Sequence, residues 1–239
     1  MKFRFLLRAL ALGIALAAAP LAAFAADAST APSPTPAMLR MLPLVPLEQS
    51  FATRVTNALT KLYATTADAE KAGYFRYTNE DRTGAISYAN PKYFNSDESH
   101  PSQLWYDVNG RLLGADFSQL VATAPEPTLF GLSPIRFHKI GLHVHYVAKQ
   151  ADGTMKYGNF IPADVFRAAG GDPEHPTAAD LVRMGKVSSV DQVPFVLAVP
   201  NNWDAQIWLI PNPDGPFADA NPNVKPSATQ GGGNGEQRG

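Results

Sequence analysis

Residues 102–120 read SQLWYDVNGRLLGADFSQL, and this stretch is the strongest indication of the fold. Alternating apolar and polar side chains lie on both sides of Asn109-Gly110, a dipeptide typical of two-residue type I′ turns, in which both residues take a positive φ. Such a turn sets the register, because directly opposed residues share a face of the sheet. The predicted pairs are Val108 with Arg111, Tyr106 with Leu113, and Leu104 with Ala115. The sequence therefore predicts an antiparallel hairpin.

The other face of this hairpin carries a candidate binding site. In the predicted register, Trp105, Asp107, Leu112 and Asp116 point to that side. Two carboxylates beside a tryptophan offer a small ligand hydrogen-bond acceptors and an apolar surface. The alternative interpretation is a solvated strand surface that one aromatic ring shields.

Helical and hairpin patterns flank this stretch on both sides. Residues 46–66 place apolar side chains three to four positions apart, which indicates an amphipathic N-terminal helix. Residues 142–157 repeat the hairpin pattern with a turn at Asp152-Gly153. Prolines and glycines bracket two short helices at 162–171 and 176–185.

Two further strands are expected near the end of the domain, at 193–200 and 203–210. Helices come first, hairpins follow, and a small helical insertion precedes these last strands. That order favours an α+β fold with an antiparallel sheet built from hairpins over alternating βαβ units.

The first 25 residues have the three parts of a secretory signal peptide. A basic start is followed by the apolar run 9–24, and Ala23-Phe24-Ala25 fits a signal-peptidase site. We therefore expect cleavage after Ala25 and a periplasmic or secreted protein without a membrane span after cleavage. An uncleaved N-terminal anchor is the alternative.

Composition predicts four parts along the chain. Residues 1–25 form the signal peptide, and 26–42 are rich in Pro, Ala and Ser, which is typical of an extended linker. Residues 43–224 are long enough for a single α+β domain with its own core. The Gly-rich residues 225–239 have too few apolar side chains to bury apolar surface and are expected to be a disordered tail.

Cysteine content and charge narrow the function classes. The chain has no cysteine, so disulfides and thiolate metal sites are excluded. Three of the 20 basic residues and none of the 21 acidic ones lie in the signal peptide, which leaves a weakly acidic mature chain. A nucleic acid is not an expected partner, because no basic surface is predicted. The oligomeric state is left open.

A histidine pair, His143 and His145, is the candidate metal site. Residues two apart on a strand point to the same side, about 7 Å apart, which one divalent metal ion can bridge. A third ligand is needed, and His138 is nearest in sequence, with Asp116 the next candidate. The alternative is a half-buried strand whose apolar face carries Val144 and whose imidazoles face water.

Three segments resemble a family of exported bacterial proteins of unknown function. The family pattern is HYxNP, then GxEY, then LHVWxWxxNPxGxFAxxNPxV. The segments SYANPKYF at 87–94, HPSQLWYDVNGRLLGADF at 100–117 and WDAQIWLIPNPDGPFADANPNV at 203–224 are similar to it. The most specific matches are Asn212, Pro213, Gly215, Phe217, Ala218, Asn221, Pro222 and Val224.

The departures from this pattern concern its polar positions. The two histidines of the family fall at Tyr88 and Gln206, and its acidic residue falls at Asp116. The resemblance therefore implies an exported protein with a shared fold and implies no activity.

The expected function is binding of a small ligand or a metal ion without catalysis. The candidate ligand-binding residues are Trp105, Asp107, Asp116, Tyr88 and Gln206. A metal-dependent enzyme using the histidine pair is one alternative, and a structural or protein-interaction module without a small-molecule site is another. Neither a nucleophile elbow nor a phosphate-binding loop occurs in the sequence.

Overall fold

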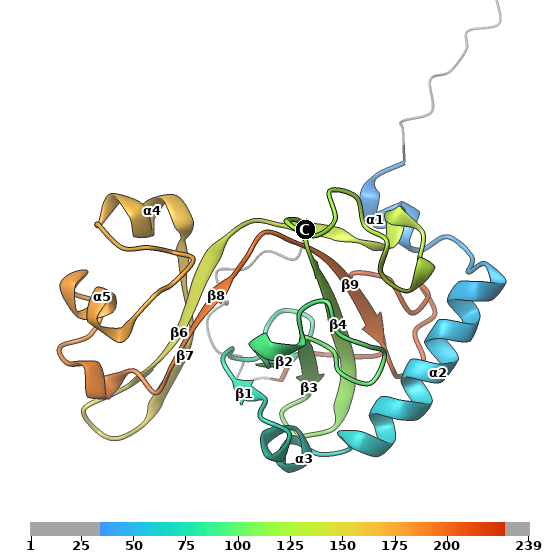
Figure 1. Cartoon of the computed structure of the whole chain (residues 1–239). Helices are drawn as coiled ribbons and strands as arrows, with labels where there is room; N and C mark the ends of the chain where they lie inside the picture. Colours follow the sequence, from blue (N-terminus) through green and yellow to red (C-terminus); the bar gives the residue numbers. More distant parts are fainter. Residues whose placement is uncertain (1–33, 228–239) are drawn as a thin grey trace, which may run out of the picture. The chain divides into compact units, whose positions relative to one another are not determined.

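Two antiparallel β-sheets organise residues 34–227, which are the residues that the computed structural model describes (Figure 1). The larger sheet has six strands in the order β1-β2-β3-β4-β9-β5, and the smaller one has three in the order β7-β6-β8. The strands of the larger sheet are β1 (Phe75–Arg76), β2 (Ile86–Ala89), β3 (Gln103–Tyr106), β4 (Leu112–Leu120), β5 (His138–Ile140) and β9 (Asn202–Trp208). Those of the smaller sheet are β6 (His143–Lys149), β7 (Met155–Pro162) and β8 (Phe195–Val199). The predicted α+β class with antiparallel sheets is confirmed.

Five α-helices and four single 3-10 turns accompany the sheets in this part of the chain. The helices are α1 (Pro36–Arg40), α2 (Pro46–Leu62), α3 (Thr66–Lys71), α4 (Ala163–Ala168) and α5 (Ala178–Arg183). The 3-10 turns are η1 (Pro91–Tyr93), η2 (Leu129–Gly131), η3 (Pro134–Arg136) and η4 (Val190–Gln192). Within residues 34–227, no helix combines the length and the hydropathy that a bilayer crossing requires.

Helix α2 covers one face of the larger sheet (Figure 1). Its apolar stripe includes Phe51, Val55 and Leu59, which have no exposed surface and pack with Leu104 and Phe117 of the sheet. Pro46 suits the first helical position, since its missing N–H would have no helical partner there. The amphipathic helix expected from the sequence thus supplies the main core, and the opposite face of the sheet is left for other side chains.

The hairpin of β3 and β4 forms as expected, but its turn differs from the prediction. Leu104 pairs with Ala115 as predicted, whereas a bulge makes Tyr106 pair with Leu112 instead of Leu113. Only Gly110 takes a positive φ, 76°, and Asn109 does not, so the type I′ turn was wrong. The Asp107 carboxylate accepts hydrogen bonds from the N–H groups of Asn109 and Arg111, which favours a turn of a different shape.

Two chain segments connect the larger sheet with the smaller one, one in each direction. Strand β5 leads into β6 and β8 leads into β9, and the two crossings lie together, where the Asn201 side chain accepts a hydrogen bond from the Leu142 N–H. A core cluster spans both sheets, with Tyr77 and Ala89 from the larger side and Val147, Leu197 and Val199 from the smaller side.

The predicted helical insertion lies between β7 and β8. Phe166 of α4 and Leu181 of α5 are fully buried against Val144 and Tyr146, which point to one face of β6 (Figure 1). The hairpin of β6 and β7 also has its predicted glycine, since Gly153 takes a φ of 86°. The face of β6 opposite this cluster points toward the larger sheet.

The N-terminal boundary of the folded region lies earlier than the predicted end of the linker at residue 42. Helix α1 begins at Pro36, and Thr35 caps it. Arg40 is 3% exposed, because its guanidinium binds Asp219 and its carbonyl accepts a hydrogen bond from Arg136. At the other end, the Ser227 N–H donates to Glu80. The predicted signal peptide with its predicted cleavage site, the predicted linker up to Ser33 and the predicted tail from residue 228 lie outside the described residues.

Candidate functional site

The face of the larger sheet that points away from α2 is lined with polar side chains. This follows from strand alternation, since residues directly opposite one another in the ladder share a face. Two cross-strand rows result. They are Gln103–Asp116–Gln206 across β3, β4 and β9, and Ser118–Asp204–His138 across β4, β9 and β5.

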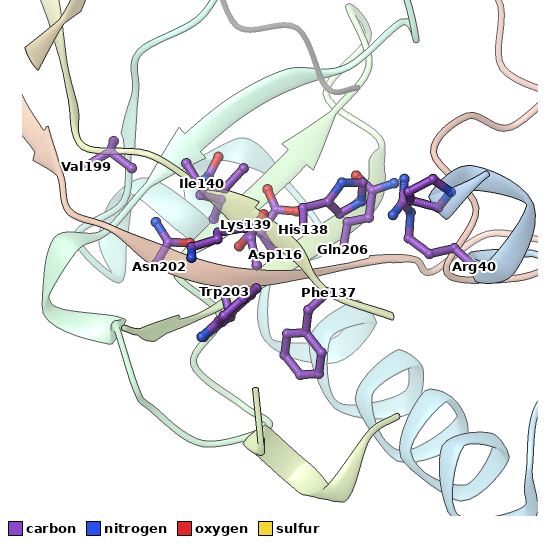
Figure 2. A pocket seen from close by; sticks show the side chains of 13 residues that line it. Arg40, Asp116, Phe137, His138, Lys139, Ile140, Val199, Asn202, Trp203 and Gln206 are labelled. Atoms are coloured by element: carbon purple, nitrogen blue, oxygen red, sulfur yellow. The ribbon is translucent and has the colours of Figure 1, made fainter. Parts of the chain in front are cut away.

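A cavity of about 400 Å³ opens on this polar face (Figure 2). Both rows contribute to its wall, together with Arg40 of α1 and Asn202 at the start of β9. Figure 2 shows Phe137 and Trp203 pointing to the other side of β9, away from Asp116 and Gln206. The cavity is therefore polar at its sheet floor, and apolar side chains such as Ile140 and Val199 border it.

Asp116 is held in the floor by a tryptophan. The Trp105 indole N–H donates to the Asp116 carboxylate over 2.8 Å, and Trp105 has no exposed surface. Gly114 makes room for the indole, because a Cβ at that position would lie 2.4 Å from the ring. The ring also meets Trp208 edge to face at 5.4 Å. The carboxylate predicted to lie beside Trp105 is thus fixed in one orientation.

Asp204 is held by a chain of hydroxyl groups. The Ser118 hydroxyl donates to the Asp204 carboxylate over 2.7 Å, and Ser102 lies 2.7 Å from the Ser118 hydroxyl. Ser102 also donates to the backbone carbonyl of Asp116. These contacts connect the Asp204 carboxylate to β4, the strand that carries Asp116.

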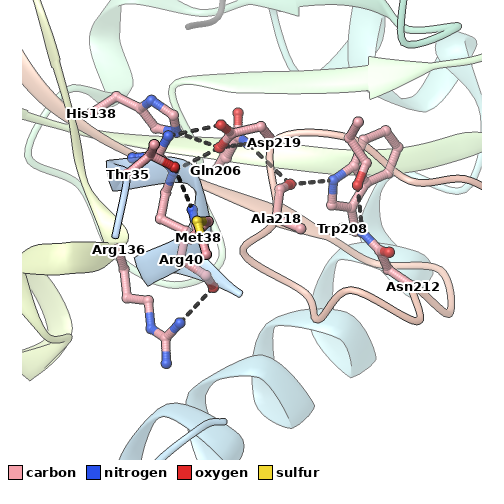
Figure 3. Close-up of polar contacts among 11 residues, drawn as sticks. Thr35, Met38, Arg40, Arg136, His138, Gln206, Trp208, Asn212, Ala218 and Asp219 are labelled. Carbon is pink, nitrogen blue, oxygen red and sulfur yellow. Dashed lines mark hydrogen bonds and ion pairs between the residues drawn. The ribbon is translucent and has the colours of Figure 1, made fainter. Parts of the chain in front are cut away.

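Asp219 compensates the positive charge of Arg40 at the rim of the cavity (Figure 3). Arg40 binds both oxygens of this carboxylate, at 2.6 and 2.8 Å, and His138 lies 3.4 Å from one of them. The planar guanidinium suits such two-point contact. Arg40 and Asp219 form a closed ion pair at the rim, so the charge of Arg40 is compensated within the protein.

The segment that resembles the exported family forms the loop that carries Asp219. Asn212 and Asn221 bond to carbonyls within this loop, and Phe217 is fully buried in the core under α2. The carbonyl of Ala218 accepts hydrogen bonds from Gln206 and Trp208 (Figure 3). The role of these matched residues in this chain is to fix the loop against the strand β9.

Asn202 places an amide oxygen in the cavity wall. Its NH₂ group donates to the carbonyl of Pro200 over 2.8 Å, and a carbonyl can only accept, so the orientation of the amide is set. The residue is 1% exposed. Among the described residues, no donor reaches its Oδ1 atom. A buried oxygen without a donor is costly, and a ligand can supply that donor.

The histidine pair is buried and does not face water. His143 and His145 are 4% and 0% exposed, and their ring centroids are 4.9 Å apart. Their side chains lie on the face of β6 that points toward the larger sheet, where His145 meets Tyr77 edge to face. The Nδ1 atoms donate to the carbonyls of Gly141 and Asn159. The expectation of solvated imidazoles was wrong because the other sheet covers them.

Among the described residues, no third metal ligand joins this pair. Within residues 34–227, no group of three or more His, Cys, Asp or Glu side chains is arranged to hold a metal ion. His138, the expected third ligand, instead lines the polar cavity beside Asp219. Asp116 lies in the floor of that cavity.

We expect that replacing both His143 and His145 by alanine leaves the metal content of the purified protein unchanged. The reason is that two imidazoles without a further ligand make a weak site. Elemental analysis of the wild type and the double variant checks this. Metal bound to the wild type in stoichiometric amount and lost from the variant would restore the metal-site interpretation.

The other predicted ligand-binding residues separate into two groups. Trp105, Asp116 and Gln206 meet on the polar face, as described above. Tyr88 points to the opposite face, where it packs against Tyr106 in the core under α2, and burial raises the pKa of its hydroxyl. Asp107 lies in the hairpin turn and lines a different hollow. Neither belongs to the cavity.

Sequence reasoning missed most residues of the wall, and four polar ones among them are Asp204, Gln103, Asn202 and Arg40. Asp204 follows the same alternation as Gln206, so the strand pattern was enough to include it. Gln103 likewise stands two positions before Trp105 on β3. Asn202 and Arg40 had no local signal, because their positions depend on the crossing between the sheets and on a partner 179 residues away.

Comparison with known proteins gave no match. No protein-family model matches the chain, and no curated protein or solved structure matches it either. The resemblance to the exported family therefore stays an expectation from the sequence, and function has to be argued from the site itself.

Proposed function

We propose that this is an exported protein whose α+β domain binds a small polar molecule in the cavity on the polar face of the larger sheet. One observation carries the proposal. Polar side chains from four neighbouring strands and from α1 surround a hollow of about 400 Å³. That volume lies in the range of sites that take metabolite-sized ligands, about 300–1,000 Å³. Export rests on the signal-peptide pattern of residues 1–25.

The proposal is for binding without catalysis. The candidate acids and bases of the wall are each tied to a structural neighbour, Asp116 to Trp105, Asp204 to Ser118 and His138 to Asp219. Such contacts preorganise side chains for recognition and lower the cost of ordering them when a ligand binds. Preorganised polar groups in a hollow are typical of a specific small-molecule site.

The test is a ligand-observed NMR screen of small amines, amides, alcohols, sugars and carboxylic acids against the mature protein. We expect at least one of these classes to bind saturably and to lose affinity by about tenfold or more in Asp116→Asn. The amide keeps an oxygen for Trp105, so the variant retains the shape of the floor. Glu126→Gln, which changes an exposed loop carboxylate, is the matched control. A screen without a binder, or equal binding to both variants, contradicts the proposal.

A further inference from the structure

A second hollow, of about 770 Å³, lies where the two sheets meet. It is lined by η1 and the residues after it, by the end of β4, by both chain segments that connect the sheets, and by the loop between α4 and α5. Ala198 and Val199 are consecutive on β8 and so point to opposite faces, Val199 to the polar cavity and Ala198 to this hollow. The hollow is therefore a separate place from the polar cavity.

The wall of this hollow is apolar, and its side chains are not part of the core. Within residues 34–227, none of them belongs to a core cluster or packs against one. Apolar side chains that lie singly on a surface are common, but several around one hollow form a contiguous apolar surface, which is typical of an interaction site. The half-buried apolar residues of this wall are Phe94, Leu120, Val121, Leu142, Ala198 and Pro200.

Backbone hydrogen bonds fix this wall in place. The carbonyl of Asn201 accepts a bond of 3.0 Å from the Val121 N–H, and its side-chain oxygen accepts one of 3.0 Å from the Leu142 N–H. The Leu120 N–H donates to the Asn95 side chain over 2.7 Å. These N–H groups bond within the protein, so they are not available to an occupant. The wall thus keeps its shape and presents mainly hydrocarbon surface, and a preformed site lowers the cost of binding.

The size and the charge of the hollow indicate which kind of molecule fits it. Its volume lies in the range of small-molecule sites, about 300–1,000 Å³. A stable protein–protein interface needs about 800 Å² on each partner, which is more than a few half-buried side chains expose. Among the described residues that line the hollow, only Glu174 and His175 are titratable, and both are exposed. An apolar molecule can therefore enter without covering a buried charge.

We propose that this hollow binds a small apolar molecule with a hydrocarbon chain or ring. The hydrocarbon packs against Phe94, Leu142 and Pro200, and a polar end points toward the loop of Glu174 and His175, where water reaches it. Binding removes apolar surface of the molecule and of the wall from water, so the affinity should grow with the length of the hydrocarbon. The inference goes beyond the proposed function and does not depend on it.

The experiment measures how the affinity depends on chain length. N-phenyl-1-naphthylamine, a neutral apolar dye, is titrated into the mature protein, and butan-1-ol, hexan-1-ol and octan-1-ol are then used to displace it. We expect each added methylene to tighten binding about threefold. If the dye does not bind, or if the three alcohols bind equally well, the proposal is overturned.

Two variants test whether the alcohols bind in this hollow. Ala122→Trp fills part of it from an exposed position, and Leu142→Asp places a carboxylate in its wall. Each should weaken octan-1-ol binding by about tenfold or more. The controls make the same changes at exposed positions outside the hollow, Ala179→Trp on α5 and Val165→Asp on α4, and should leave binding unchanged.

Ala122→Trp keeps the test valid if Leu142→Asp does not fold, because Ala122 is exposed. Undiminished octan-1-ol binding in Ala122→Trp overturns the proposal, whatever the polar cavity binds. A loss in Ala122→Trp together with an equal loss in Ala179→Trp overturns it as well, since the effect would then not come from the hollow.

Discussion

Replacing Glu48 by alanine should lower the free energy of unfolding by about 3–5 kcal/mol, because it leaves the Arg136 charge buried without its partner. Both side chains are at most 2% exposed, and the guanidinium and carboxylate lie 2.9 Å apart. Glu48 also accepts hydrogen bonds from the N–H groups of Val45 and Ser133. The carboxylate thus joins the start of α2 to the loop before β5. A loss of this size is a large share of a domain's usual stability of about 5–15 kcal/mol.

Urea unfolding of the wild type and of Glu48→Ala measures the effect, and Glu70→Ala, an exposed change on α3, is the control. We expect the midpoint to fall without a change in slope in the first variant and to stay in place in the control. Arg136 also donates to the carbonyls of Arg40, Leu42 and Pro43, so Arg136→Met should cost at least as much. A loss below about 1 kcal/mol in Glu48→Ala would mean that the ion pair is not the anchor of this region.

Low pH should remove the contribution of the Glu48–Arg136 ion pair to stability. Burial opposes ionisation of Glu48, but hydrogen bonds from Arg136, Val45 and Ser133 outweigh it and hold the pKa below the ordinary value of 4.5. A carboxyl whose folded pKa is lowered stabilises the protein above its unfolded pKa and loses that contribution as the pH falls through the folded value. The stability gap between wild type and Glu48→Gln should therefore shrink as the pH is lowered below about 4.5.

Gly114→Ala should cost about 3 kcal/mol of stability, because the floor of the cavity has no room for a methyl group. The new Cβ would lie 2.4 Å from the Trp105 ring and 2.6 Å from the carbonyl oxygen of Ile207. The ring cannot retreat without losing its hydrogen bond to Asp116, and the carbonyl belongs to the neighbouring strand β9. We therefore expect the variant to be less stable and the cavity floor around Trp105 to be distorted.

Gly141→Ala is the matched control, since nothing lies within 4 Å of a Cβ at that position. Its stability should stay within about 0.5 kcal/mol of the wild type. Denaturant unfolding compares the two variants, and tryptophan fluorescence reports the displacement of the indole. Equal stability of Gly114→Ala and Gly141→Ala would show that the packing around Trp105 is loose.

The parts of the fold that the sequence predicted are those decided locally. The stripe of α2, the hairpins at 102–120 and 142–157, and the helical insertion all follow from periodicity and turn residues. The predicted type I′ turn was wrong because the Asp107 carboxylate accepts hydrogen bonds from the backbone N–H groups of the turn. A side-chain hydrogen bond of this kind overrides the usual preference of the Asn-Gly dipeptide.

The parts that could not be predicted depend on contacts between distant segments. Arg40 stands in a segment whose composition is typical of a linker, and only its contact with Asp219 makes it part of the site. The alternation of β6 was predicted correctly, yet the burial of His143 and His145 follows from the larger sheet, which no local pattern reveals. Asp116, Asp204 and Gln206 of the cavity wall follow from alternation on β4 and β9, whereas the position of Asn202 depends on the crossing between the sheets.

The three tryptophans of the chain allow the most direct test that a small molecule binds in this cavity. The Trp105 indole N–H donates to Asp116 in the cavity floor, while that of Trp203 donates to the carbonyl of Ala124 on the other side of the sheet. In ¹⁵N-labelled protein, a compound that binds in the screen should move the Trp105 indole signal saturably and leave the Trp203 signal in place. An unmoved Trp105 signal at saturating compound, or a shift of Trp203 alone, would contradict a ligand site on the polar face.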